Sequence, residues 1–134
     1  MMTDLTTAEP GAILAQFSPL PSTPEDLVRY AQASGDSNPL HLDPEFARQA
    51  GFANLVVHGM LNMAHLGRLL TDHFCAERIR SFNARFEGVV LVGQRVTYRA
   101  CLVEKSSDGI TLALEGALSS GARVISGQAF IAAN

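Results

Sequence analysis

An acid and an imidazole lie five positions apart in the segment 34–43, on either side of an Asn38-Pro39 bend. Proline stiffens such a bend, so the carboxylate of Asp36 and the ring of His41 can be brought together. Proton transfer is most effective when two groups of different protonation state reach the same reacting atoms, and it contributes roughly 10²–10⁴-fold to a rate. The segment therefore predicts acid–base chemistry carried by Asp36 and His41.

Two other interpretations of these residues remain open. Asp36 can simply cap a turn while His41 serves as a structural histidine. A zinc site built from Asp36, His41, Asp43 and His58 is the second interpretation. Asp43 and His58 are better explained as a helix N-cap and a helix-entry residue, and no ligand spacing typical of zinc is present. We therefore expect neither a metal nor a cofactor.

Gly59 follows His58 at the start of a long apolar segment. An N–H at the start of a helix has no intrahelical acceptor and lies at the positive end of the helix dipole. Glycine also lets a substrate carbonyl approach the backbone closely. We expect the Gly59 N–H to stabilise a developing oxyanion, although an ordinary helix start is the simpler alternative.

Helices and strands must position these residues. Three helices are predicted from their capping residues and apolar positions, at 24–35, 44–50 and 59–74. A short first strand is expected at 12–17. From Arg78 onward, β-branched and apolar runs separated by Gly and Ser predict four antiparallel strands in a meander, at 81–86, 94–104, 110–118 and 123–131. The order of elements indicates an α+β fold with a central helix.

The composition restricts the class of protein. A chain of 134 residues with 47% hydrophobic and 17% charged residues is typical of a single globular domain, here 1–134, and its modest core suits a homodimer. The net charge of -3 and the scattered Lys and Arg residues argue against nucleic acid as a partner. No signal peptide or membrane-spanning segment is recognised, so we expect a soluble cytoplasmic protein.

Three short motifs together resemble a known family. They are Tyr30-x3-Ser34-Gly35-Asp36-x-Asn38-Pro39-Leu40-His41-x-Asp43, then Gly51-Phe52, then Val57-His58-Gly59-Met60. The combination is similar to the hydratase 2 motif of MaoC-like dehydratases, which include (R)-specific enoyl-CoA hydratases and 3-hydroxyacyl-carrier-protein dehydratases. The motif extends over about thirty positions, which makes it far more specific than any single element.

This resemblance implies a hot-dog fold, with a curved antiparallel sheet around the helix that begins at Gly59. It implies a homodimer whose sheets join side by side, with the active site at the interface. The catalytic roles fall on Asp36, His41 and Gly59, while Asn38 and His58 orient the loop or bind substrate. Some members have a serine near the position of Ala64, so a hydroxyl contact is missing here.

The implied activity is the reversible hydration of 2-enoyl thioesters of coenzyme A or an acyl carrier protein, without a cofactor, in fatty acid metabolism. A hot-dog thioesterase is one alternative, although the Asp36, Asn38 and His41 pattern disfavours it. A non-catalytic subunit that stabilises a paired dehydratase is another, which the retention of Asp36, His41 and Gly59 disfavours.

Overall fold

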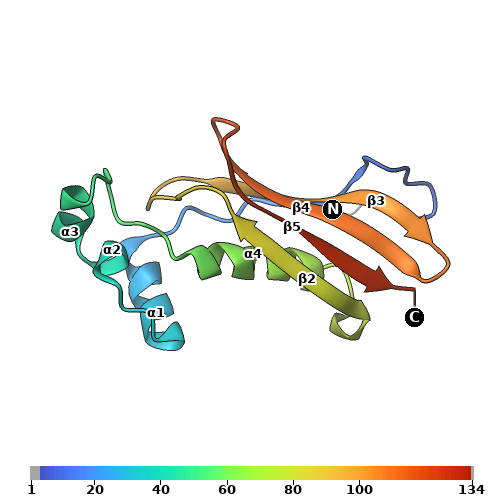
Figure 1. Ribbon diagram of the computed structural model, residues 1–134, viewed down its shortest axis with the longest axis horizontal. Coiled ribbons are helices and arrows are strands. Elements are labelled where there is room, and N and C mark those ends of the chain that lie inside the picture. The colour runs from blue at the N-terminus through green and yellow to red at the C-terminus, as the bar shows by residue number, and fades with distance from the viewer. Residues whose placement is uncertain (1–3, 134) are drawn as a thin grey trace.

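The first three helices of the protein gather at one end of its sheet. The computed structural model describes residues 4–133 and shows the first three helices beyond the end of the sheet, with the longest helix running from them along its face (Figure 1). The helices are α1 (Pro24–Ser34), α2 (Pro39–Leu42), α3 (Pro44–Gln49), α4 (Gly59–Thr71) and the 3₁₀ helix η1 (Ala76–Arg78). The three predicted helices are confirmed, with α4 ending slightly earlier than expected.

The short helix α2 was not predicted. Pro39 occupies its first position, and the Asn38 side chain accepts a hydrogen bond from the backbone N–H of Leu40 as its N-cap. A cap and a proline at the first position therefore make one helical turn of the segment that carries His41. The predicted caps of the longer helices are also present, since Thr23 caps α1 and Asp43 caps α3.

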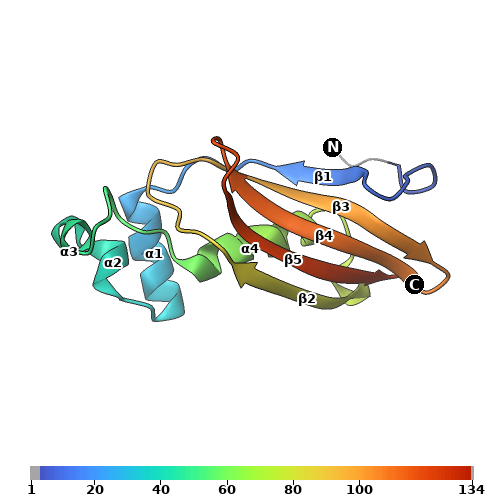
Figure 2. The same ribbon diagram turned by 45° about the horizontal axis from the view of Figure 1, so that its top comes forward.

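Five antiparallel strands form one sheet in the order β1-β3-β4-β5-β2 (Figure 2). The strands are β1 (Ile13–Phe17), β2 (Ile79–Phe86), β3 (Val96–Ser106), β4 (Gly109–Leu118) and β5 (Arg123–Ala132). The sheet is curved and one of its faces covers α4 (Figure 1). The expectation of a curved antiparallel sheet packed on a central helix is thus confirmed.

The prediction of a meander in chain order is wrong for β2. This strand pairs with β5, with Phe86 opposite Ile125, and not with β3. The segment 87–95 that follows β2 does not turn back as a hairpin. Its backbone bonds instead to the segment before α4, where the Val57 N–H donates to the Val90 carbonyl. The chain therefore crosses the end of the sheet before it forms β3, and only β3, β4 and β5 make a meander.

The sheet and α4 bury the core between them. Leu66, Leu69 and Leu70 of α4 are fully buried with residues of the three central strands. One buried polar side chain of α4, Asn62, accepts a hydrogen bond of 3.2 Å from the hydroxyl of Tyr98 on β3. Because this polar group is satisfied, it can lie in the core without a large free-energy penalty.

Two phenylalanines of β2 pack on two glycines of α4. The ring of Phe86 lies 3.4 Å from the position that a Cβ would take at Gly59, and the ring of Phe82 lies 3.6 Å from the same position at Gly67. Both glycines thus let the strand approach the helix closely. Among residues 4–133, no helix is both long and apolar enough to span a bilayer.

Candidate active site

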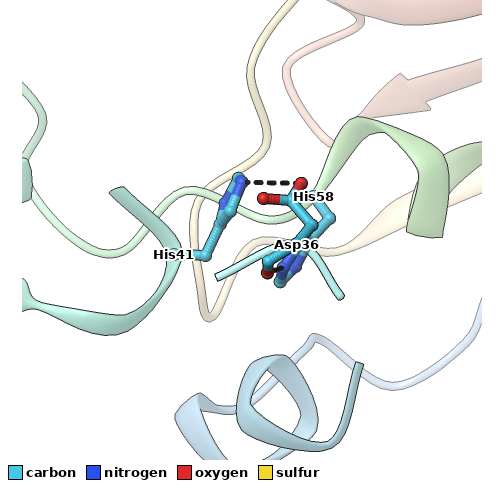
Figure 3. Close-up of side chains that lie close together, drawn as sticks. All are labelled: Asp36, His41 and His58. Atoms are coloured by element: carbon cyan, nitrogen blue, oxygen red, sulfur yellow. Dashed lines mark hydrogen bonds and ion pairs between the residues drawn. The ribbon is translucent and has the colours of Figure 1, made fainter. Parts of the chain in front are cut away.

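Three segments of the chain meet at the N-terminal end of α4. The loop after α1 supplies Asp36, the single turn of α2 supplies His41, and the residue before α4 is His58 (Figure 3). A carboxylate oxygen of Asp36 and one ring nitrogen from each histidine all lie within 4.8 Å of one another. The structure therefore brings together the predicted acid–base pair and His58.

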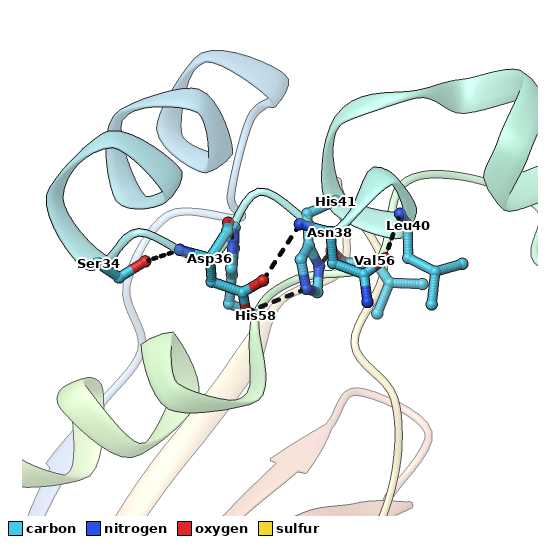
Figure 4. Close-up of polar contacts among 7 residues, drawn as sticks. All are labelled: Ser34, Asp36, Asn38, Leu40, His41, Val56 and His58. Atoms are coloured by element: carbon cyan, nitrogen blue, oxygen red, sulfur yellow. Dashed lines mark hydrogen bonds and ion pairs between the residues drawn. The ribbon is translucent and has the colours of Figure 1, made fainter.

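Side chain to backbone hydrogen bonds give the loop its shape (Figure 4). The Ser34 hydroxyl accepts from the Asp36 N–H, the Asp36 carboxylate accepts from the Asn38 N–H at 3.2 Å, and the Asn38 side chain accepts from the Leu40 N–H at 3.0 Å. Such local bonds replace those of a helix or sheet. Asn38 therefore contributes to the loop conformation through its side chain.

His41 is held by a backbone carbonyl. Its Nδ1 lies 2.6 Å from the carbonyl oxygen of Val56, and the Val56 N–H in turn donates to the carbonyl of Leu40. A carbonyl only accepts, so Nδ1 carries the proton and Nε2 is left for chemistry. The side chain is 11% exposed, which limits its freedom.

The Asp36 carboxylate faces this free nitrogen. Its Oδ2 lies 3.6 Å from Nε2 of His41, which is longer than a direct hydrogen bond. Two groups at this separation can both bond one water molecule at about 2.8 Å from each. The Asp36 side chain is 51% exposed, so water and substrate can reach the pair.

His58 lies behind the pair and is almost fully buried. Its Nε2 donates to the backbone carbonyl of Asp36 at 3.1 Å, and its ring stacks on that of His41 with centroids 3.8 Å apart. Burial holds the pKa of His58 below its ordinary value, although the bond to the Asp36 carbonyl acts in the opposite direction. His58 is therefore neutral at neutral pH.

Gly59 begins α4, and its backbone N–H has no intrahelical acceptor. The Leu61 N–H already donates to the His58 carbonyl, whereas the Gly59 N–H lies at the positive end of the helix dipole. The ring of Phe86, which is 49% exposed, borders Gly59. The arrangement offers an amide donor with an apolar wall beside it.

The same cluster does not suit a metal ion well. Among the residues of the alternative zinc site, Asp43 instead caps a helix, because its carboxylate accepts from the N–H groups of Glu45 and Phe46. The rings of His41 and His58 are stacked with 22° between their planes, so the lone pairs of their free nitrogens do not converge on one point. A tetrahedral ion needs converging ligands.

Three contributors to the site were not predicted. The Val56 carbonyl fixes the tautomer of His41, the ring of Tyr30 lies 4.7 Å from that of His58, and Phe86 borders Gly59. Only Tyr30 had a signal in the sequence, because it begins the first motif. The other two depend on the course of the chain in three dimensions.

Comparison with known proteins shows a match over most of the chain. The model of the MaoC like domain matches residues 6–116. The chain is 43% identical over 72 residues to the mitochondrial 3-hydroxyacyl-[acyl-carrier-protein] dehydratase of Arabidopsis thaliana, covering 54% of this chain and 43% of that protein. The chain thus spans less than half the length of this curated relative. Since that relative is mitochondrial by name, the expected cytoplasmic location stays a prediction.

Solved structures show the same fold. The (R)-hydratase from A. caviae involved in PHA biosynthesis has a TM-score of 0.82 at 28% identity, and the match covers 94% of this chain and 97% of that one. The R-hydratase PhaJ1 from Pseudomonas aeruginosa has a TM-score of 0.82 at 25% identity, covering 95% and 83%. The predicted α+β hot-dog fold is therefore confirmed.

Proposed function

Because the chain belongs to the family of MaoC-like domains, we propose that it catalyses the reversible addition of water to 2-enoyl thioesters, giving (R)-3-hydroxyacyl thioesters. The observation that carries this proposal is the facing pair of the Asp36 carboxylate and the His41 imidazole, 3.6 Å apart. The chain is then a hydro-lyase, with 1–134 acting as one domain. The names of the Arabidopsis relative and the two structural neighbours agree with this chemistry.

The two side chains divide the protons of the reaction. In hydration, the water oxygen bonds to C3 of the enoyl group while one of its protons passes to Asp36. His41, protonated on both nitrogens at this point, gives its Nε2 proton to C2 and keeps its Nδ1–H on the Val56 carbonyl. A proton then passes from Asp36 to His41 and restores both groups, and dehydration follows the same steps in reverse.

The backbone N–H of Gly59 donates a hydrogen bond that stabilises the negative charge developing on the thioester oxygen as C3 is attacked. Donors at a helix start are already oriented, so they stabilise this charge without reorganising. The neighbouring ring of Phe86 places an apolar group beside this glycine. The glycine is thus expected to act through its backbone alone.

We also propose that the active protein is a homodimer with its sheets joined edge to edge. Two observations support this: β2 is the last strand of the described sheet on its side, and the Asp36 carboxylate is half exposed within one chain. An unprotected strand edge favours pairing with a second strand. Sedimentation of the active protein tests this, and full activity in a monomeric species would contradict it.

Crotonyl-CoA separates the candidate functions. A hydratase removes the absorbance of the conjugated enoyl group without releasing a thiol, whereas a thioesterase releases free coenzyme A. A non-catalytic subunit does neither when purified alone. Asp36→Asn, prepared in the same way, controls for contaminating hydratase, and chiral analysis should find the (R) product.

The carrier and the acyl length follow from a second series. Initial rates on 2-enoyl thioesters of increasing length, each linked to coenzyme A or to an acyl carrier protein, define the substrate class. A rate that falls sharply beyond one length would locate the end of the acyl site. Equal rates on both carriers would mean that recognition is confined to the acyl group and the phosphopantetheine arm that the two carriers share.

A further inference from the structure

His58 has an unusual set of contacts for a residue at the start of a helix. It is 1% exposed and occupies the N-cap of α4, yet its side chain makes no capping hydrogen bond. Residues favoured at this position cap the helix with a short polar side chain. The imidazole of His58 must therefore be explained by what it contacts outside its own helix.

One contact reaches the backbone of the catalytic acid. Nε2 of His58 donates to the carbonyl oxygen of Asp36 at 3.1 Å, across 22 residues of sequence. Because this carbonyl can only accept, the proton of the neutral ring lies on Nε2 and Nδ1 is bare. Nδ1 is buried and has no hydrogen-bond partner among the described residues.

The other contact reaches the catalytic imidazole. The rings of His58 and His41 are stacked at 3.8 Å with 22° between their planes, and the ring of Tyr30 lies 4.7 Å from His58. Stacking on one face and packing against Tyr30 fix the plane of the His58 ring. His58 therefore touches both members of the acid–base pair without lying between them.

From this geometry we propose that His58 is a positioning residue that works only as a neutral imidazole, and that its protonation inactivates the site. The proposal rests on the proposed hydratase function and adds a regulatory property to it. The hydrogen bond sets the position of Asp36, and the stacked ring sets the plane of His41. A loss of either contact moves one member of the pair relative to the other.

Protonation is disruptive because of where the second proton must go. It must bind Nδ1, which is buried with no acceptor among residues 4–133, and a buried unpaired donor is unfavourable. The ionisable groups that face the ring are the carboxylate of Asp36, the imidazole of His41 and the phenol of Tyr30. The carboxylate would attract a cation, but the mechanism also needs a protonated His41, and two stacked cations repel.

Two substitutions separate the contacts. His58→Gln retains a donor near the position of Nε2 but has no ring, whereas His58→Phe retains the ring but has no donor. Displacing an orienting partner typically lowers activity by about 10- to 100-fold, and we expect each variant to lose kcat in this range with little change in KM. Neither new side chain titrates, so the acid limb of the residual activity should move to lower pH.

His65 provides the matched control. It lies in α4, its Nδ1 is also buried with no hydrogen-bond partner in the part of the chain that the structure describes, and burial lowers its pKa as well. Its ring contacts Phe17 and Tyr98, however, and not the catalytic pair. His65→Phe should therefore keep both kcat and the acid limb of the wild-type protein.

The pH dependence of stability checks the protonation state itself. In the unfolded chain a histidine binds a proton near pH 6.5, whereas folded His58 binds it only at lower pH. Between the folded and unfolded pKa values the unfolded state thus binds more protons. The folded state therefore loses stability as the pH falls from about 6.5 through the folded pKa. Both His58→Phe and His65→Phe should reduce this loss, but only the first should change the pH profile of activity.

Imidazole NMR distinguishes this proposal from the proposed function. Changed titration and tautomer signals of His41 in the His58 variants support positioning even if no thioester is hydrated. Should His58→Phe fail to fold, His58→Gln gives the same measurement. Unchanged His41 signals in a folded variant, or wild-type kcat and acid limb in both variants, would overturn the proposal. Failure of the wild-type protein to hydrate crotonyl-CoA would instead overturn the function.

Discussion

The two ends of α4 are held in different ways. At its N-terminal end, His58 and Gly59 lie beside a loop whose shape depends on hydrogen bonds to particular carbonyl and N–H groups. Further along, Leu66 and Leu69 are buried in apolar contact with the sheet. Apolar burial is non-directional, whereas hydrogen bonds fix direction. One helix thus combines a region that provides stability with a region that provides geometry, and substitutions should separate the two.

The largest expected effect is on activity alone. Asp36→Asn keeps an oxygen that can accept from the Asn38 N–H but cannot accept a proton from water. We expect kcat/KM on crotonyl-CoA to fall by about 10²–10⁴-fold with little change in the thermal midpoint. Adding His41→Ala should reduce activity little further, because the two groups act as a unit. Near-normal turnover in folded Asp36→Asn would remove this residue from the mechanism.

The opposite result is expected in the core. Leu66→Ala leaves a cavity under the sheet and should lower the free energy of unfolding by about 2–5 kcal/mol. Urea unfolding measures this loss, and kcat, corrected for the folded fraction, should stay at the wild-type value. If kcat fell in proportion to stability, the two regions of α4 would not be independent.

Gly59→Val tests the boundary between the two regions. A Cβ at this position reaches the Phe86 ring at 3.4 Å, and the branches of valine must displace that ring or the thioester carbonyl. We expect kcat to fall by about 10- to 100-fold, less than the 10²–10³ typical of a deleted oxyanion donor, and KM to change less. The matched variant Gly59→Ala adds only a Cβ at ordinary contact distance. Its kcat should lie between those of the wild-type protein and Gly59→Val. Full kcat in folded Gly59→Val would place the oxyanion site elsewhere.

The smallest expected effect is at the start of α1. Thr23 and Asp26 form a reciprocal capping box there, at the end of the helix away from the loop that carries Asp36. Thr23→Ala should lower the free energy of unfolding by about 1 kcal/mol and leave kcat unchanged. A clear loss of kcat would mean that the whole of α1, and not only its end, orients the loop.

Local signals in the sequence predicted most of the helices and strands. Thr23, Asp43 and the glycine at position 35 act through bonds to residues a few positions away, so their effect can be inferred from neighbours in the chain. The partner of β2 could not be inferred in this way. It depends on the crossing of 87–95 over the segment before α4, which joins residues far apart in sequence.

The same division applies to the site. Asp36, His41 and Gly59 were predicted from residue types, spacing and a family resemblance, and the structure places them around one end of α4. The carbonyl of Val56 was missed because every residue has a backbone carbonyl, so no residue type marks the one that orients His41. The close packing of Phe86 was missed because the path of β2 was predicted wrongly.

The two glycine–phenylalanine contacts require that the spacing of the glycines along α4 match the spacing of the phenylalanines along β2. Gly59 and Gly67 are eight residues apart on the helix, or about 12 Å, and Phe82 and Phe86 are four residues apart on the strand, or about 13 Å. Inserting one residue between Phe82 and Phe86 turns one ring to the other face of the sheet. Inserting one residue between the two glycines of the helix rotates one glycine relative to the other by about 100°. Insertions and deletions within these two segments should therefore be far less tolerated than substitutions at the same positions. Natural length variation should be confined to the loops outside the two segments.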